Sequence, residues 1–268
     1  MNATPLLKYP GGKRKKAAAI AASFDDKTPF CDLFVGSGAV SLAARARNPE
    51  RWHVGGEASS FTHAWWEGWL MGKDPCRPPT LERDDAVYYA LRERFNEGAA
   101  LTLGELYYLN KVGFNGLVRF NGMGGYNVSV GKAASPTIPA PDLEQVRAHK
   151  SLGAALLLAN TWEGALRNAG PTASIYADAP FLGGFAAYTA QGWSAMDLDA
   201  LCAAMARRDN PALLSEHTGG EAQVIIERHG GDLVHTWPRS GSISAKADER
   251  QPVSEGIWAF NGATWRGA

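Results

Sequence analysis

The chain has 268 residues, of which 45% are hydrophobic, and it carries 27 basic and 27 acidic side chains. This length and apolar content suffice for one large folded domain, or for a domain with an insertion. The zero net charge excludes a general attraction to polyanions, so a nucleic-acid partner would have to be bound by local patches.

Two further classes of protein are disfavoured by the sequence. No apolar run approaches the about 20 residues needed to cross a bilayer, and the first residues lack the pattern of a secretion signal. The cysteines Cys31, Cys76 and Cys202 are far apart and have no metal-ligand spacing, which argues against disulfides and a structural zinc site. We therefore expect a cytoplasmic protein with no membrane partner and no bound metal.

The first segment with a chemical signature runs from Leu6 to Lys13. Two apolar residues precede Tyr9, and a Gly-Gly pair then lets the backbone approach another group closely before Lys13. The segment is either a solvated turn or a ligand clamp in which Tyr9 and Lys13 point inward.

A strand, a glycine turn and a helix follow. The apolar run at residues 30–35 leads into Gly36-Ser-Gly38 and then into helical periodicity, and a second strand is expected at residues 51–54. Glu57 comes about twenty residues after the turn, where an acidic residue bonds ribose hydroxyls in doubly wound sheets. The third glycine of a dinucleotide fingerprint is missing, but the whole unit predicts a nucleoside-binding site.

The middle of the chain changes character twice. Residues 62–104 have helical periodicity and many aromatic rings, which indicates a helical insertion with its own core. Residues 109–132 are rich in glycine, asparagine, aromatic and basic side chains, and we interpret them as too polar for a core. Asparagine and arginine read base edges and rings wedge between bases, so this stretch is either a nucleic-acid-reading hairpin or a flexible surface loop.

Strands are expected again at residues 154–159 and 174–177, each followed by polar groups at the same sheet edge. After the second strand come Asp178, Ala179 and Phe181. The Asp178 carboxylate and the Ala179 carbonyl are suited to accept the two hydrogens of an exocyclic amine while the Phe181 ring stacks on the heterocycle. The alternative is an ordinary strand end.

A helix from Ser194 and strands near residues 212, 232 and 255 complete the prediction.

These motifs occur in the order seen in the Dam-type, D12-class DNA N6-adenine methyltransferases, and the chain resembles that family from about Leu6 to Phe260. Lys8-Tyr-Pro-Gly-Gly-Lys13 is similar to K-W-x-G-G-K, Phe34-Val-Gly-Ser-Gly38 to F-x-G-x-G, and Asp178-Ala-Pro-Phe181 to D-P-P-Y. The family's L-N-[RK]-x-G-[YF]-N-G-L-x-R-[YF]-N segment and hairpin end correspond to Leu109 through Asn121 and Gly124 through Lys132. Its late R-S-I-S…R…E pattern corresponds to Arg239 through Ser244, Arg250 and Glu255.

The resemblance implies an α/β fold: a Rossmann-like methyltransferase sheet formed by residues 1–58 and 150–268, with an inserted DNA-recognition domain at 59–149. It implies methyl transfer from S-adenosyl-L-methionine to the N6 amine of adenine in double-stranded DNA, at GATC sites, in a bacterial or phage-infected cell. The implied catalytic residues are Asp178, Ala179, Pro180 and Phe181. The implied cofactor-binding residues are Tyr9, Lys13, Phe34, Gly36, Gly38, Glu57, Thr161, Trp162 and Asp178. The implied DNA-binding residues are Phe114, Asn115, Leu117, Arg119, Asn121 and Lys132.

The chain departs from the family pattern at the site itself. Ala179 replaces the first proline of D-P-P-Y, which predicts a looser catalytic loop. Thr161 stands where many relatives have an acid that accepts from the cofactor's adenine amine, and a neutral hydroxyl is a weaker acceptor. Two alternatives to an active adenine methyltransferase therefore stay open: a DNA-binding relative that has lost catalysis, and a phage enzyme on the same fold that adds a different group to a DNA base.

Overall fold

The computed structural model describes residues 3–72, 75–132, 135–184, 192–238 and 254–267. Their centre is a seven-stranded sheet in the order β3-β2-β1-β4-β5-β7-β6. Strands β1 to β5 are parallel, whereas β7 is antiparallel to both of its neighbours. The strand bounds are Phe30–Asp32 for β1, His53–Gly56 for β2, Leu156–Ala159 for β3, Ser174–Ala177 for β4, Ala212–His217 for β5, Asp232–Pro238 for β6 and Ser254–Phe260 for β7.

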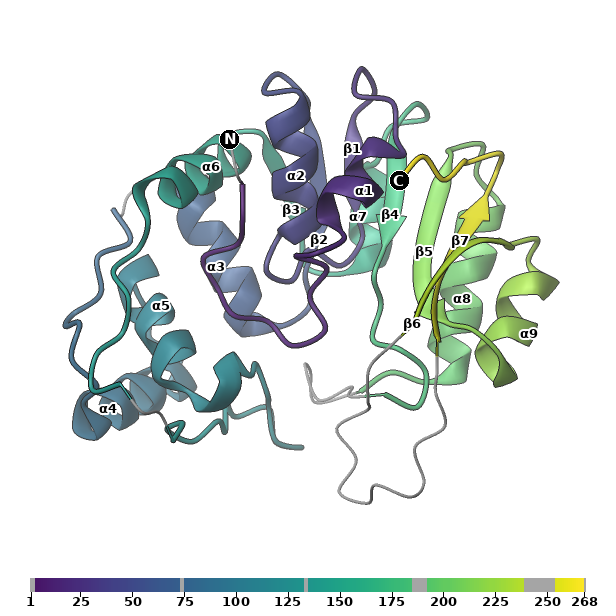
Figure 1. The fold of residues 1–268 in the computed structure, drawn as a ribbon. Coiled ribbons are helices and arrows are strands. Elements are labelled where there is room, and N and C mark those ends of the chain that lie inside the picture. Colours follow the sequence, from purple (N-terminus) through teal and green to yellow (C-terminus); the bar gives the residue numbers. More distant parts are fainter. Residues whose placement is uncertain (1–2, 73–74, 133–134, 185–191, 239–253, 268) are drawn as a thin grey trace.

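Helices cover both faces of the sheet (Figure 1). On one face, α1 (Ala17–Ala22) and α2 (Ala39–Arg47) bury their apolar side chains against β1, β4 and β7. On the other face lie α7 (Trp162–Asn168), α8 (Ala195–Ala206) and α9 (Gly220–Arg228). This doubly wound arrangement confirms the predicted α/β fold class.

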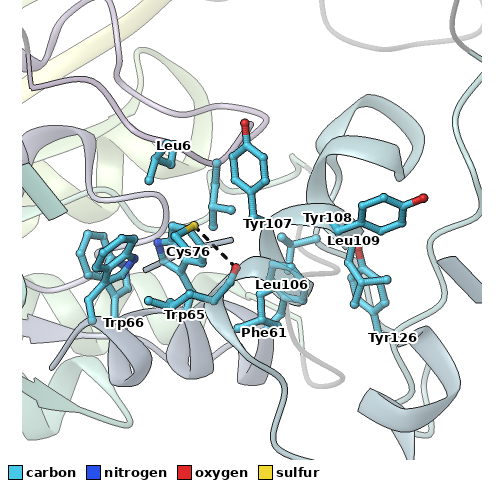
Figure 2. Packing of buried hydrophobic residues seen from close by; sticks show 14 of the residues in the cluster. Leu6, Phe61, Trp65, Trp66, Cys76, Leu106, Tyr107, Tyr108, Leu109 and Tyr126 are labelled. Carbon is cyan, nitrogen blue, oxygen red and sulfur yellow. Dashed lines mark hydrogen bonds between the residues drawn. The ribbon is translucent and has the colours of Figure 1, made fainter. Parts of the chain in front are cut away.

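The inserted region is helical, as predicted, and lies beside the sheet (Figure 1). It contains α3 (Ser60–Met71), α4 (Asp85–Asn96), α5 (Leu103–Val112), the 3₁₀ turn η1 (Phe114–Gly116) and α6 (Leu143–Gly153). Figure 2 shows how its aromatic rings pack together, including the stacked pair Phe61 and Tyr126, whose centroids are 5.2 Å apart. The same core includes Leu42 from α2 and Leu156 from β3. The division into two domains stays a prediction, and its second boundary falls inside α6.

The stretch 109–132 differs from expectation. Isolated antiparallel bridges join Gly113 to Val130 and Phe120 to Tyr126, so its two arms pair as a hairpin. The interpretation that it is too polar for a core is wrong, because alternate residues of the arms face inward. The residues buried in the helical core are Leu109, Val112, Val118, Phe120, Tyr126 and Val128.

Two negative expectations concern the whole chain. The three cysteines are buried and free. Within the described ranges, every helix is too short or too polar to traverse a lipid bilayer.

Candidate functional site

A cavity of about 570 Å³ opens at the carboxyl ends of β1, β2 and β4. Strand β1 lies between β2 and β4, so the chain order reverses here, and such a switch point is where open α/β sheets bind ligands. The turns that follow four neighbouring strands contribute Gly36, Glu57, Trp162 and Asp178 to the cavity wall. Residues from distant parts of the sequence therefore meet as the strand pattern predicted.

Both glycines of the turn have a left-handed backbone conformation, and an aromatic ring lies close to each. Gly36 has φ +49°, and a Cβ there would lie 3.2 Å from the Tyr9 ring. Gly38 has φ +78°, and a Cβ would lie 2.2 Å from the ring of Trp66. The Trp66 indole also donates a 2.8 Å hydrogen bond to the carbonyl of Gly36. Sequence reasoning missed this role of Trp66, because its helical spacing is that of any core ring.

Glu57 holds the same turn from the other side. Its Oε2 accepts a 2.9 Å hydrogen bond from the Gly36 amide, and its Oε1 accepts a 2.9 Å bond from the Ser59 amide. Burial raises the pKa of Glu57 to about 7 against these stabilising bonds. A carboxylate has about four acceptor positions, so Glu57 retains capacity for ligand hydroxyls. Phe34 and Trp162 add aromatic rings to the same wall.

Thr161 and Trp162 begin helix α7 at the cavity. The Thr161 hydroxyl accepts a 3.2 Å hydrogen bond from the Gly164 amide and so caps the helix. The Thr161 hydroxyl, which was predicted to be a weak acceptor for the cofactor, therefore already accepts a hydrogen bond from the Gly164 amide. Glu163, in the first turn of α7, also lines the cavity, and sequence analysis assigned it no role.

The corner of the cavity around Asp178 contains a network of charged side chains. The Lys13 ammonium bonds the Asp178 carboxylate and lies 3.6 Å from Glu255 Oε1, while Lys16 Nζ lies 2.8 Å from Glu255 Oε2. Burial raises the pKa of Asp178, and the charge of Lys13 opposes this. Tyr9 and Lys13 both line the cavity, so both face inward, while their contact with a ligand stays a prediction.

The rest of the D-P-P-Y-like motif follows Asp178. Ala179 is 3% exposed, whereas Pro180 and Phe181 are partly exposed on the cavity wall. The Phe181 ring contacts the His217 ring edge-on, with centroids 4.7 Å apart, and the Lys13 ammonium lies 4.9 Å from the Phe181 centroid. The aromatic face predicted to stack on a base is thus fixed on two sides.

Asp32, at the end of β1, lines the cavity but is not among the site residues predicted from the sequence. Its Oδ2 accepts a 2.7 Å hydrogen bond from the Ser41 hydroxyl, and burial raises its pKa to about 7. Asp32 lies in the apolar run that predicted the strand, and one acidic residue in such a run does not by itself indicate a functional site. Across the described part of the chain, no group of three potential ligands is placed to hold a metal ion.

The predicted DNA-binding residues divide into two groups. Leu117 lines the cavity, and Phe114, Asn115 and Lys132 are exposed. The side chains of the other two bond within the hairpin. Arg119 donates to the Asn127 side chain at 2.9 Å and to its carbonyl at 3.1 Å.

Asn121 closes the hairpin turn. Its Oδ1 accepts from the amides of Met123 and Gly125 at 3.0 and 2.9 Å, so this oxygen is used inside the turn. The late pattern at Arg239 through Ser244 and Arg250 lies outside the described residues, whereas Glu255 joins the charge network.

One buried asparagine joins the hairpin to the N-terminal clamp. The Asn110 side chain accepts from the Lys8 amide at 2.8 Å and donates to the carbonyls of Lys8 and Gly116 at 2.9 and 3.2 Å. Asn110 is 0% exposed. The base of the hairpin and the segment that leads to Lys13 are therefore held together.

Comparison with known proteins decides the family. The model of the D12 class N6 adenine-specific DNA methyltransferases matches residues 9–53 and 77–241, well over half of the chain. The chain belongs to this family. The family assignment makes the protein an adenine-specific DNA methyltransferase.

Named relatives agree with this assignment. A DNA adenine methylase of Vibrio cholerae is 27% identical over 249 residues, which cover 86% of this chain and 82% of the relative. A DNA adenine methylase of Haemophilus influenzae is 30% identical over 66% of this chain and 63% of its own length. A solved precorrin-6y C5,15-methyltransferase from Geobacter metallireducens covers 96% of this chain and is itself covered over 98% of its length, at a TM-score of 0.41 and 12% identity, a likeness too low to bear on function.

Proposed function

We propose that the protein transfers a methyl group from S-adenosyl-L-methionine to the N6 amine of an adenine that is flipped out of duplex DNA. The observation that carries this proposal is the Asp178 carboxylate at the cavity wall, bonded to Lys13. Glu57 and the Gly36 turn supply acceptors and bare backbone for a nucleoside in the same cavity.

The chemistry follows from the acceptors. The lone pair of an exocyclic amine is delocalised into its ring, so the amine is a poor nucleophile. The Asp178 carboxylate and the Ala179 carbonyl accept its two hydrogens, which localises the lone pair and stabilises the positive charge that develops on nitrogen. When bound, S-adenosyl-L-methionine would supply a methyl group on a positively charged sulfur; the sulfur would keep the electron pair of the broken S–CH3 bond and leave as a neutral thioether, and the methylated amine would release one proton to solvent. The Phe181 ring stacks on the flipped base.

For the DNA target we propose GATC. Leu117 and Arg119 are similar to the residues at which GATC-reading relatives contact DNA, and Arg119 is oriented by Asn127. Phe114, Asn115 and Lys132 are exposed on the same segment, where a ring, an amide and a cation suit base steps, base edges and phosphate.

A labelled-methyl assay tests the proposal. Duplexes that carry one GATC site, or the same bases in scrambled order, are incubated with the protein and the labelled cofactor, and the product nucleosides are identified by mass. We expect label on adenine N6 in the first duplex. Asp178→Asn should abolish transfer and leave the fold, measured by circular dichroism, intact.

The possible outcomes separate the candidate functions. DNA binding without any transfer would refute catalysis and favour a relative that only occupies sites. A modified base of another mass would refute methyl transfer and favour a different donor. Equal labelling of the two duplexes would refute the GATC proposal alone.

A further inference from the structure

The loop that carries the amine-binding residues is attached to the neighbouring strand by a carboxylate that no sequence motif indicated. Glu216 lies near the end of β5, which pairs with β4 in parallel. Its Oε2 accepts a 3.2 Å hydrogen bond from the amide of Leu182, directly after Phe181, and its Oε1 accepts a 2.7 Å bond from the amide of His217.

The burial of Glu216 carries a desolvation free energy that its hydrogen bonds must offset. The side chain is 0% exposed, and transfer of a carboxylate out of water is unfavourable unless its bonds compensate. In the described part of the chain, the His217 imidazole is the one basic side chain within 4 Å of the Glu216 carboxyl group, with Nδ1 3.8 Å from Oε1. The two backbone amides are therefore the main hydrogen-bond donors to this carboxyl group.

The contacts of Glu216 and His217 act on the same short segment. Glu216 fixes Leu182 and the backbone of His217, while the His217 ring lies edge-on against Phe181 at 4.7 Å. The chain then turns, because the Gly184 amide bonds the Phe181 carbonyl at 2.8 Å. Two residues of β5, Glu216 and His217, thus fix the orientation of the Phe181 ring.

We propose that Glu216 is a positioning residue for the base-stacking ring of Phe181 and for the Asp178 and Ala179 acceptors. This inference rests on the proposed function. Residue 179 is alanine, which restrains the backbone less than proline does. Glu216 restrains the loop from its far end, so the loop keeps the geometry that the reaction needs.

Hydrogen exchange tests the attachment without any activity. Glu216→Gln and Glu216→Ala are compared with wild type and with Glu221→Gln, an exposed glutamate of α9, by mass spectrometry of peptides that cover residues 178–184. We expect the Leu182 amide to exchange about tenfold faster in Glu216→Ala, the scale of one lost buried hydrogen bond. Exchange in β7 should stay unchanged. Unaltered exchange at Leu182 would overturn the proposal.

Kinetics then separates positioning from general support of the fold. In Glu216→Ala we expect kcat for methyl transfer to fall about tenfold or more while the cofactor Kd stays constant, because Glu57 and Gly36 are untouched. Adding Ala179→Pro should restore part of kcat, since the ring restrains the other end of the loop. The proposal would be overturned if Glu216→Ala weakened cofactor binding as much as it lowered kcat. It would also be overturned if adding Ala179→Pro did not raise kcat. A wild-type protein without transfer would refute the proposed function, and the exchange result would then decide the role of Glu216 by itself.

Discussion

The Lys13 ammonium bonds the Asp178 carboxylate across 165 positions of sequence. Both groups are held in the cavity wall, Lys13 being 5% exposed and the Asp178 side chain 19%. Lys13 therefore has an electrostatic role besides any contact with a ligand. It favours the ionised form of the carboxylate that burial disfavours.

Lys13→Met should shift the pH dependence of methyl transfer to higher pH. Lys13 lowers the pKa of Asp178, so its removal raises that pKa, and a higher pH is then needed to generate the accepting carboxylate. At pH 7 we expect a loss of about tenfold or more in the single-turnover rate, with partial recovery near pH 9. Lys15→Met, at an exposed site, is the control. An unshifted profile in Lys13→Met would contradict this role.

Gly38→Ala should destabilise the fold. A Cβ at this position would lie 2.2 Å from the Trp66 ring, and φ is +78°, so we expect a loss of about 2 kcal/mol or more in the free energy of unfolding. Gly170→Ala is the matched control, because nothing lies within 4 Å of a Cβ there. Urea unfolding of the two variants measures the difference. Equal midpoints would show that Trp66 moves aside without cost.

Arg119→Ala should reduce discrimination between GATC and a site that differs by one base pair by about 1–3 kcal/mol. Asn127→Ala should have a smaller effect in the same direction, because Arg119 would lose the 2.9 Å side-chain bond but keep its 3.1 Å bond to the carbonyl of residue 127. Ratios of kcat/KM on the two duplexes give the result. Unchanged selectivity in Arg119→Ala would mean that the hairpin is not the reader.

The free energy of unfolding should fall as pH rises from about 5 to 8. Burial raises the pKa of Asp32, Glu57 and Glu216 to about 7, so the folded protein binds more protons than the unfolded chain between their ordinary values and about 7. Stability then decreases with pH, by at most about 1.4 kcal/mol per pH unit for each group. Denaturant midpoints across this range test the sign.

Asp32→Asn provides the internal comparison for that titration. The variant removes one of the three groups and should flatten the slope of stability against pH. A midpoint that rises with pH in the wild type would show that other ionisable groups dominate.

Much of the site was predictable because its signals are local. Strand runs followed by Gly36, Glu57 and Asp178 put these residues at one sheet edge, as parallel strands require. Glu216 was not predictable, because its partner Leu182 is adjacent only through the pairing of β5 with β4. The inward residues of the hairpin were missed because the polar ones that alternate with them dominate its composition.

The hydrogen bonds of Asn110 affect how a DNA-recognition segment can be transferred from one methyltransferase to another. Lys8 lies before the inserted region and Gly116 lies within it, yet one side chain bonds both. A chimaera that receives residues 59–149 from another methyltransferase would replace Asn110 and keep Lys8, so the side chain at position 110 and its backbone partner at position 8 would come from different proteins. The portable unit for redesign is therefore the hairpin together with the N-terminal segment up to Lys13, transferred as a pair.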